Sequence, residues 1–117
     1  MTKIKTDKNG LAMKGYDPVS YFSNDGPKQG NPAHSTEWSG ATWHFATAEN
    51  RDRFLTDPTR YAPQFGGHCA LAQLIGQDVK ASPKRWMIED GKLFLNKNIV
   101  AQGMASITKD RIVKRAN

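Results

Sequence analysis

The feature that most constrains the fold is the Asp90-Gly91 dipeptide, which separates two short apolar runs. Asp-Gly between such runs is the strongest short signal for a β-hairpin, because its second residue accepts a positive φ without strain. Residues 85–89 and 92–95 are therefore predicted to be paired antiparallel strands. A chain of 117 residues has room for one core of ordinary size. We expect the hairpin to belong to a single domain.

A second hairpin is predicted over residues 36–45. Ser39-Gly40-Ala41 is a short glycine-containing connection between two runs that are rich in aromatic residues. Side chains alternate between the two faces of a strand, so Trp43 and Phe45 should share one face and His44 should point to the other.

Short helices are predicted between and after the hairpins. They span residues 48–55, 68–75 and 98–115. Thr47 and Asn98 are good N-caps for the first and last of these helices. In the last helix, Val100, Met104 and Ile107 recur at a spacing that makes a narrow apolar stripe, which is typical of an amphipathic helix.

These elements predict an α+β fold, a small single domain of β-hairpins packed with short α-helices over residues 11–117. The polar residues 1–10 are expected to form a flexible N-terminal segment. No internal repeat is evident in the sequence. No apolar run approaches the roughly 18 residues of a membrane span, and no secretory signal is present. The sequence as printed predicts a soluble cytoplasmic protein, and a chain from which a leader had been removed would be periplasmic.

Charge is distributed unevenly along the chain. Residues 1–58 carry as many Lys and Arg as Asp and Glu, so the formal net charge of +6 lies in residues 59–117. Cations of this kind neutralise phosphates and drive nonspecific nucleic-acid binding. No nucleic-acid recognition motif accompanies the charge, so a nucleic-acid partner is not predicted. A solvated helix face, with cations near a helix C-terminus, accounts for the same pattern.

Several sequence blocks resemble one known family. Residues 15–22 read Gly-Tyr-Asp-Pro-Val-Ser-Tyr-Phe, and residues 57–70 run from Asp-Pro-Thr-Arg-Tyr to Gly-Gly-His-Cys-Ala. Together with residues 38–54 and 86–96, these blocks resemble the YHS domain family, in particular its small stand-alone bacterial members. The resemblance implies a small α+β domain of hairpins packed with short helices, and a role described mostly as metal binding.

The chain departs from that family at the expected thiolate positions. In cysteine-containing YHS domains, cysteines follow the Asp-Pro-Val motif and the aromatic strand, where this chain has Ser20 and Ala46. Asn50 occupies a further position that is often cysteine. Stand-alone members usually read Gly-Gly-Tyr-Cys-Ala, whereas here His68 precedes Cys69. Any thiol chemistry must therefore use Cys69, the single cysteine of the chain.

Cys69 is the first candidate for a functional residue. A thiolate at a helix N-terminus is stabilised by the helix dipole and by free amides, and a neighbouring histidine can lower its pKa further. Thiolate and imidazole suit copper(I) and zinc. The predicted metal ligands are Cys69, His68 and His44, with His34 the next choice. Two alternatives stay open, a reactive thiol and an inert buried cysteine. A homodimer would supply a second cysteine.

A pocket beside Cys69 is also predicted. Its candidate residues are Tyr16, Asp17, Tyr21, Trp43, Tyr61, Phe65, Gly66 and Gly67. Most of these aromatic side chains are equally candidates for the core. Asp17 is expected to cap a turn, and the two glycines form either an anion-binding nest or a plain turn.

No catalytic or nucleotide-binding fingerprint is present, so neither an enzyme nor an organic cofactor is predicted. The predicted function is a non-catalytic YHS module that binds copper or zinc. The alternatives are a redox sensor with a reactive Cys69 thiol, or a domain that binds a small ligand in an aromatic pocket.

Overall fold

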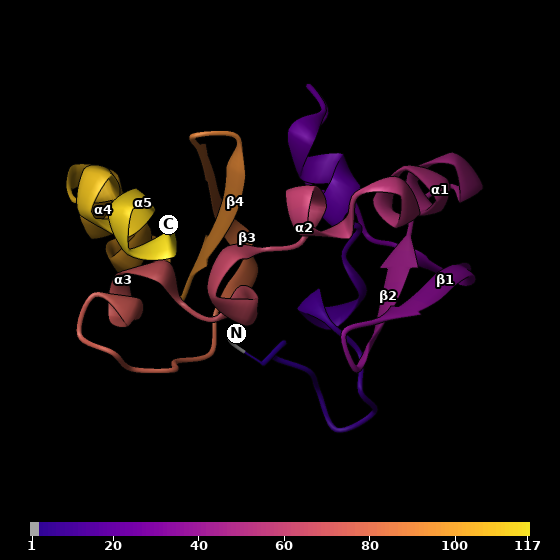
Figure 1. Cartoon of the computed structure of the whole chain (residues 1–117), viewed down its shortest axis with the longest axis horizontal. Coiled ribbons are helices and arrows are strands. Elements are labelled where there is room, and N and C mark those ends of the chain that lie inside the picture. Colours follow the sequence, from indigo (N-terminus) through magenta and orange to yellow (C-terminus); the bar gives the residue numbers. More distant parts are fainter. Residues whose placement is uncertain (1–2) are drawn as a thin grey trace.

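Two antiparallel β-hairpins organise the molecule, and the computed structural model describes residues 3–117 (Figure 1). The strands are β1 (Asn31–Trp38) with β2 (Ala41–Phe45), and β3 (Ser82–Glu89) with β4 (Lys92–Asn96). Both turns use two consecutive residues with positive φ, as a type I′ turn requires: Ser39-Gly40 and Asp90-Gly91. Both predicted hairpins are confirmed.

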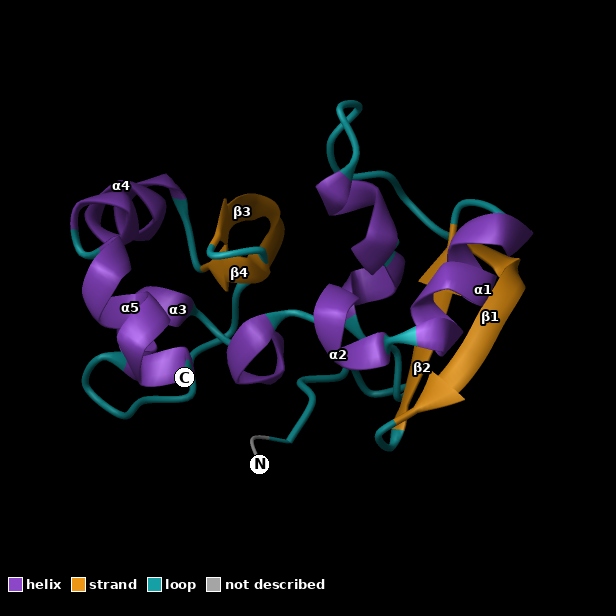
Figure 2. Cartoon of the chain, turned by 45° about the horizontal axis from the view of Figure 1, so that its top comes forward, coloured by secondary structure: helices purple, strands orange, loops and turns teal. Residues whose placement is uncertain are grey.

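Short helices connect and cover the hairpins (Figure 2). In chain order they are η1 (Met13–Gly15), η2 (Pro18–Phe22), α1 (Ala48–Thr56), α2 (Pro58–Tyr61), η3 (Gln64–Gly67), α3 (Ala70–Gln73), α4 (Ile99–Ile107) and α5 (Lys109–Ala116). The α+β class is confirmed. Within residues 3–117, no helix is long and apolar enough to cross a membrane, as the sequence predicted.

The hairpins belong to two structural repeats. β1 begins at Asn31 and β3 at Ser82, an offset of 51 residues, and the same offset relates every strand pair of the two ladders. Both ladders contain an irregularity at the same place, before Ser35 in one and before Trp86 in the other. We call residues 11–61 the first unit and residues 62–116 the second unit.

The same correspondence extends to the helices. α1 and α4 have nine residues each. The Thr47 hydroxyl oxygen accepts the N–H of Asn50 at 3.1 Å, and the Asn98 side-chain oxygen accepts the N–H of Ala101 at 2.9 Å. Asp17 and Cys69 are the N-caps of η2 and α3, with one extra residue inserted before Cys69.

The repeat is almost invisible in the sequence because the two units share turns and helix caps at matching positions but few identical residues. Between residues 31–61 and 82–112, the identical pairs are Pro32 with Pro83, Gly40 with Gly91, and Arg60 with Arg111. Positive φ at a turn and a hydrogen-bonding cap tolerate several residue types. Sequence reasoning therefore found the hairpins and caps singly and missed their correspondence.

Two clusters of buried side chains form the interior. The larger one contains the aromatic residues of the first unit, among them Trp43, Phe45 and Phe54, which are all fully buried. The smaller one, in the second unit, contains Phe94 and the α5 residue Ile112. Successive β4 residues face opposite sides, so Leu93 packs in the first cluster and Phe94 in the second. The second hairpin thus lies between its own helices and the first unit (Figure 1).

Residues 1–10 are predicted to form a flexible N-terminal segment, and the described part of it, residues 3–10, is hydrogen-bonded to the rest of the chain. Residues 1 and 2 lie outside the described part of the chain. Ile4 is buried, and the Lys5 N–H donates to the Gly66 carbonyl at 2.8 Å. Thr6 forms an isolated bridge with Ala12. The segment is therefore held against both units by backbone hydrogen bonds, which its polar composition does not reveal.

The terminal helix predicted over residues 98–115 is instead two helices. Thr108, with φ −104° and ψ 19°, separates α4 from α5. Ile112 of α5 is fully buried in the interior of the second unit, whereas the predicted apolar stripe lies outside. The buried α4 residues are Ala101 and Ala105, whereas Val100, Met104 and Ile107 are exposed.

Candidate functional site

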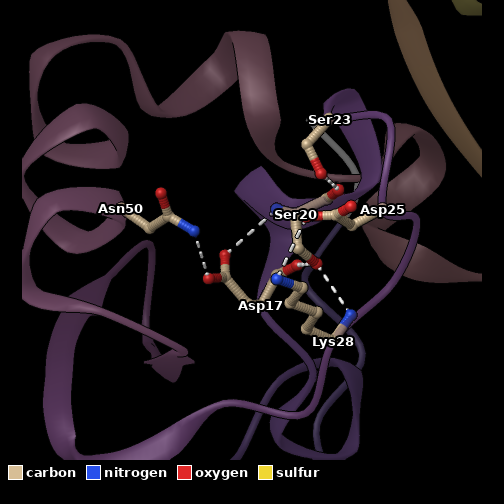
Figure 3. Close-up of polar contacts among 6 residues, drawn as sticks. All are labelled: Asp17, Ser20, Ser23, Asp25, Lys28 and Asn50. Atoms are coloured by element: carbon tan, nitrogen blue, oxygen red, sulfur yellow. Dashed lines mark hydrogen bonds and ion pairs between the residues drawn. The ribbon is translucent and has the colours of Figure 1, made fainter.

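A buried carboxylate closes the first unit where η2 meets α1 (Figure 3). Asp17 is fully buried, and its Oδ1 accepts the N–H groups of Val19 at 2.8 Å and Ser20 at 3.3 Å. Its Oδ2 accepts the Ala46 N–H and the Asn50 Nδ2 amide, both at 2.8 Å. We call this arrangement the Asp17 clamp. It confirms Asp17 as a turn cap and also joins three segments of the unit.

Three positions where the family resemblance leads one to expect cysteines converge on this clamp. They are Ser20, Ala46 and Asn50. The Ser20 hydroxyl donates to the Asp17 carbonyl at 2.6 Å and accepts the Lys28 N–H at 2.9 Å. The Ser20 hydroxyl, the Ala46 N–H and the Asn50 side-chain amide are therefore all hydrogen-bonded around Asp17.

The second unit has no such clamp. Cys69 stands at the N-cap that corresponds to Asp17, and Ala101 stands where Asn50 does in α1. Both residues line a groove of about 450 Å³, which we call the Cys69 groove. Its lining residues are Cys69, Leu71, Ala72, Leu74, Ile75, Val79, Lys97, Ala101, Thr108 and Arg111. The second unit therefore carries an open apolar groove where the first unit has a closed polar contact.

The Cys69 side chain is almost covered, at 2% exposure, although the residue is among those that line this groove. Its thiol donates a weak hydrogen bond to Asn96 Oδ1 at 3.8 Å. Asn96 Oδ1 also accepts the Leu71 N–H at 3.2 Å, which ties β4 to the start of α3. The Cys69 N–H donates to the Val79 carbonyl at 2.8 Å, so this amide is not free for an anion.

Asn96 adds a further polar group near Cys69. It is fully buried, and its Nδ2 has no hydrogen-bond partner among the described residues. An unpaired buried amide is uncommon because burial removes its hydrogen bonds to water. Asn96 occupies the position that Phe45 holds in the first unit, so a polar side chain replaces an aromatic one beside Cys69.

The three predicted metal ligands are placed differently. His68 has an extended backbone (φ −77°, ψ 163°), in which successive side chains point to opposite sides, away from Cys69. Its Nδ1 donates to the Phe65 carbonyl at 2.7 Å. His44 lies in β2 of the first unit, beside Gly15 and Gly30. Within residues 3–117, no three His, Cys, Asp or Glu residues are grouped so as to hold a metal ion.

The residues predicted to line an aromatic pocket lie elsewhere. Tyr21 and Trp43 belong to the core of the first unit. The Tyr21 hydroxyl donates to the Pro83 carbonyl at 2.6 Å, and burial raises the pKa of this phenol. Phe65 and Gly66 line a second hollow of about 570 Å³, and Gly67 lines a third of about 140 Å³. None of the eight predicted pocket residues is among those that line the Cys69 groove.

Gly66 has a structural role. Its φ is +66°, and a Cβ at this position would lie 2.2 Å from the Lys3 carbonyl oxygen. Only glycine permits this approach of two backbones. The turn reading of the Gly66-Gly67 pair therefore accounts for the residue without a bound anion.

The aliphatic lining of the groove escaped sequence reasoning. Leu71, Leu74 and Ile75 follow Cys69 directly, and they would be core residues in the helix predicted over residues 68–75. α3 is only four residues long, and it leaves Ile75 exposed while Leu71 and Leu74 are partly buried against the second cluster.

Comparison with protein-family models, with curated proteins and with solved structures finds no match to this chain.

Proposed function

We propose that the protein is a non-catalytic binding module, related to the YHS domains, whose ligand occupies the Cys69 groove. The observation that carries this proposal is a difference between corresponding positions of the two units. Asp17 and Asn50 close the first unit by a hydrogen bond, whereas Cys69 and Ala101 line an open groove at the same place in the second. A groove that the fold closes in one repeat and leaves open in the other is suited to a ligand.

The lining favours a ligand with an aliphatic part. Leucine, isoleucine, valine and alanine side chains dominate the groove, and Ile75 at its rim is 77% exposed. Covering such surface releases about 25 cal/mol for each Å² removed from water. This supports the small-ligand alternative drawn from the sequence, with an aliphatic lining in place of an aromatic one.

The charged groups of the groove favour an anionic head group on that ligand. Lys97 and Arg111 are the charged residues of the lining, and no acidic residue accompanies them. Arg111 belongs to α5 and Lys97 precedes α4, so the two cations approach the groove from different elements. A medium-chain carboxylate fits this combination, with its chain over Leu71 and its carboxylate beside a cation.

Nuclear magnetic resonance tests this assignment. Decanoate is titrated into the uniformly ¹⁵N-labelled protein, and the expected result is a saturable shift of the Leu71, Ala72 and Ala101 amides. Ala101→Asn installs the residue of the first unit and narrows the groove, so these shifts should be lost. Asn50→Gln, in the first unit, is the matched control and should leave them unchanged. Equal shifts in both variants, or none in the wild type, would contradict the proposal.

A soft metal ion is the second candidate ligand. Cys69 is among the residues that line the groove, and copper(I) and zinc prefer thiolate ligands. Because the described residues hold no group of three ligands, the remaining donors would come from a second molecule. Native mass spectrometry of the reduced protein with zinc or buffered copper(I), beside Cys69→Ser, tests this. Metal bound to both proteins equally, or to neither, would exclude a Cys69 metal site.

A further inference from the structure

The outer surface of α4 carries a row of exposed aliphatic side chains. Ile99, Val100, Met104 and Ile107 are 66%, 71%, 49% and 79% exposed. Residues three and four apart share one side of a helix, so Val100, Met104 and Ile107 adjoin one another. We call these four residues the α4 row. Large aliphatic side chains that gather on a surface, rather than scatter singly, mark an interaction site.

The first unit supplies an internal control for this row. α1 corresponds to α4 residue by residue, and it carries Ala48, Glu49, Arg53 and Thr56 at the four matching positions. The fold therefore does not require aliphatic residues at these exposed positions. Their presence in α4 alone points to a partner of the second unit.

The charge of the segments that contain the two helices also differs between the units. Residues 97–116 contain one acidic residue, Asp110, and five cations, namely Lys97, Lys109, Arg111, Lys114 and Arg115. The matching residues 46–65 contain equal numbers of acidic and basic side chains. The partner must therefore offer an apolar region together with negative charge.

We propose that the α4 row inserts into the surface of an anionic lipid bilayer. α4 lies at one end of the molecule (Figure 1). The side chains of the row are exposed, and a fluid acyl layer fills the spaces between protruding groups. The net positive charge of residues 97–116 adds attraction to anionic headgroups, with Lys109 also paired to Glu89 at 3.7 Å. A second copy of this chain fits less well, because two second units would meet with like charge.

Cosedimentation with vesicles tests the proposal directly. The probes are vesicles of phosphatidylcholine alone, and vesicles of three parts phosphatidylcholine to one part phosphatidylglycerol. The wild type should bind the anionic vesicles, and binding should weaken about tenfold or more at high salt, where screening is strong. Binding to both vesicles alike, or to neither, would overturn the proposal.

Two charge-neutral variants separate the row from the net charge. The Ile99→Ala and Ile107→Thr double variant installs the first-unit residues without changing charge, and it should bind anionic vesicles at least about tenfold more weakly. Leu55→Ser in α1 removes an exposed aliphatic residue far from the row and should bind as the wild type does. If the double variant binds as tightly as the wild type, the α4 row is not the membrane contact.

The remaining outcomes identify the other occupants. Light scattering that shows a wild-type dimer, converted to a monomer by the double variant, would assign the row to self-association and overturn the proposal. Capture of an acidic helical peptide in preference to anionic vesicles would overturn it in favour of a protein partner. Ala101→Asn should keep vesicle binding, so this proposal and the Cys69 groove fail or stand separately.

Discussion

The two units share one backbone plan and differ in how they fill it. The first unit packs large aromatic side chains, such as Trp43 and Phe54, and closes its helices with the Asp17 clamp. The second unit has Phe94 and Ala105 at those positions, and Cys69 and Ala101 in place of the clamp. Cys69 and Ala101, the residues that replace the clamp, line the groove of the second unit. Under the proposed function, the first unit supplies stability and the second presents the binding surfaces.

The largest expected effect concerns the clamp itself. Asp17→Ala leaves several buried N–H donors without an acceptor, so the free energy of unfolding should fall by about 3–5 kcal/mol. Cys69→Ala, at the matching N-cap, removes one sulfur atom and should cost only about 1 kcal/mol. Urea unfolding monitored by tryptophan fluorescence measures both. Similar losses at the two positions would break the distinction between the units.

Asn50 tests the partner of the clamp. Asn50→Ala leaves one Asp17 oxygen with the Ala46 N–H alone and should lower the free energy of unfolding by about 2 kcal/mol. Asn50→Asp is the harsher variant, because it sets a second carboxylate against Asp17. The same urea experiment serves here, and an Asn50→Ala variant as stable as the wild type would show that the clamp holds without its α1 partner.

Because Tyr21 is buried, we expect the free energy of unfolding to fall at alkaline pH. Burial raises the pKa of Tyr21 in the folded state, so its contribution is fully present below pH about 10 and is lost as the pH rises above that value. Tyr21→Phe should cost about 1.5 kcal/mol at neutral pH, because the Pro83 carbonyl loses its donor.

Thermal unfolding between neutral pH and pH about 11 provides the measurement for Tyr21. The wild-type Tm should fall more steeply than that of Tyr21→Phe. Tyr61→Phe, which keeps the buried phenol, should follow the wild type. Parallel curves for the wild type and Tyr21→Phe would show that the Tyr21 phenol does not govern the alkaline loss.

The smallest expected effect is the loss of a helix N-cap, which should lower the free energy of unfolding equally in both units. Thr47→Ala and Asn98→Ala each remove one N-cap hydrogen bond and should each lower the free energy of unfolding by about 1 kcal/mol. Urea unfolding of the two single variants provides the comparison. A cap that matters in only one unit would mean that the shared backbone plan does not carry shared energetics.

Local signals predicted most of the fold. Ser39-Gly40 and Asp90-Gly91 located the hairpins because positive φ at a tight turn restricts the residues that fit there. Thr47 and Asn98 located two helix starts because a cap needs a side-chain acceptor. Trp43 and Phe45 lie on the buried face of β2, as alternation predicted, with His44 on the other face.

The features that the sequence did not predict depend on tertiary contacts. Tyr21 and Trp43, predicted to line a pocket, are buried in the first core, since large rings bury the most area. Phe65 packs against the second cluster instead. α4 buries the small residues Ala101 and Ala105 and exposes its large aliphatic residues, which the spacing of the large residues alone does not indicate. His44 and Cys69 belong to different units. Their separation along the sequence does not indicate whether the two side chains come close enough to share a metal ion. The groove depends on the absence of a clamp, which becomes visible only when the units are compared.

The most direct test of the central claim is the reactivity of the Cys69 thiol toward a small apolar methanethiosulfonate. If Cys69 lies in an open groove, the folded protein should be labelled far faster than it unfolds, and decanoate should slow the labelling by covering the groove. Ala101→Asn should slow it as well. Labelling limited to the rate of global unfolding, and unchanged by decanoate, would show that Cys69 is a closed core residue and would contradict the account.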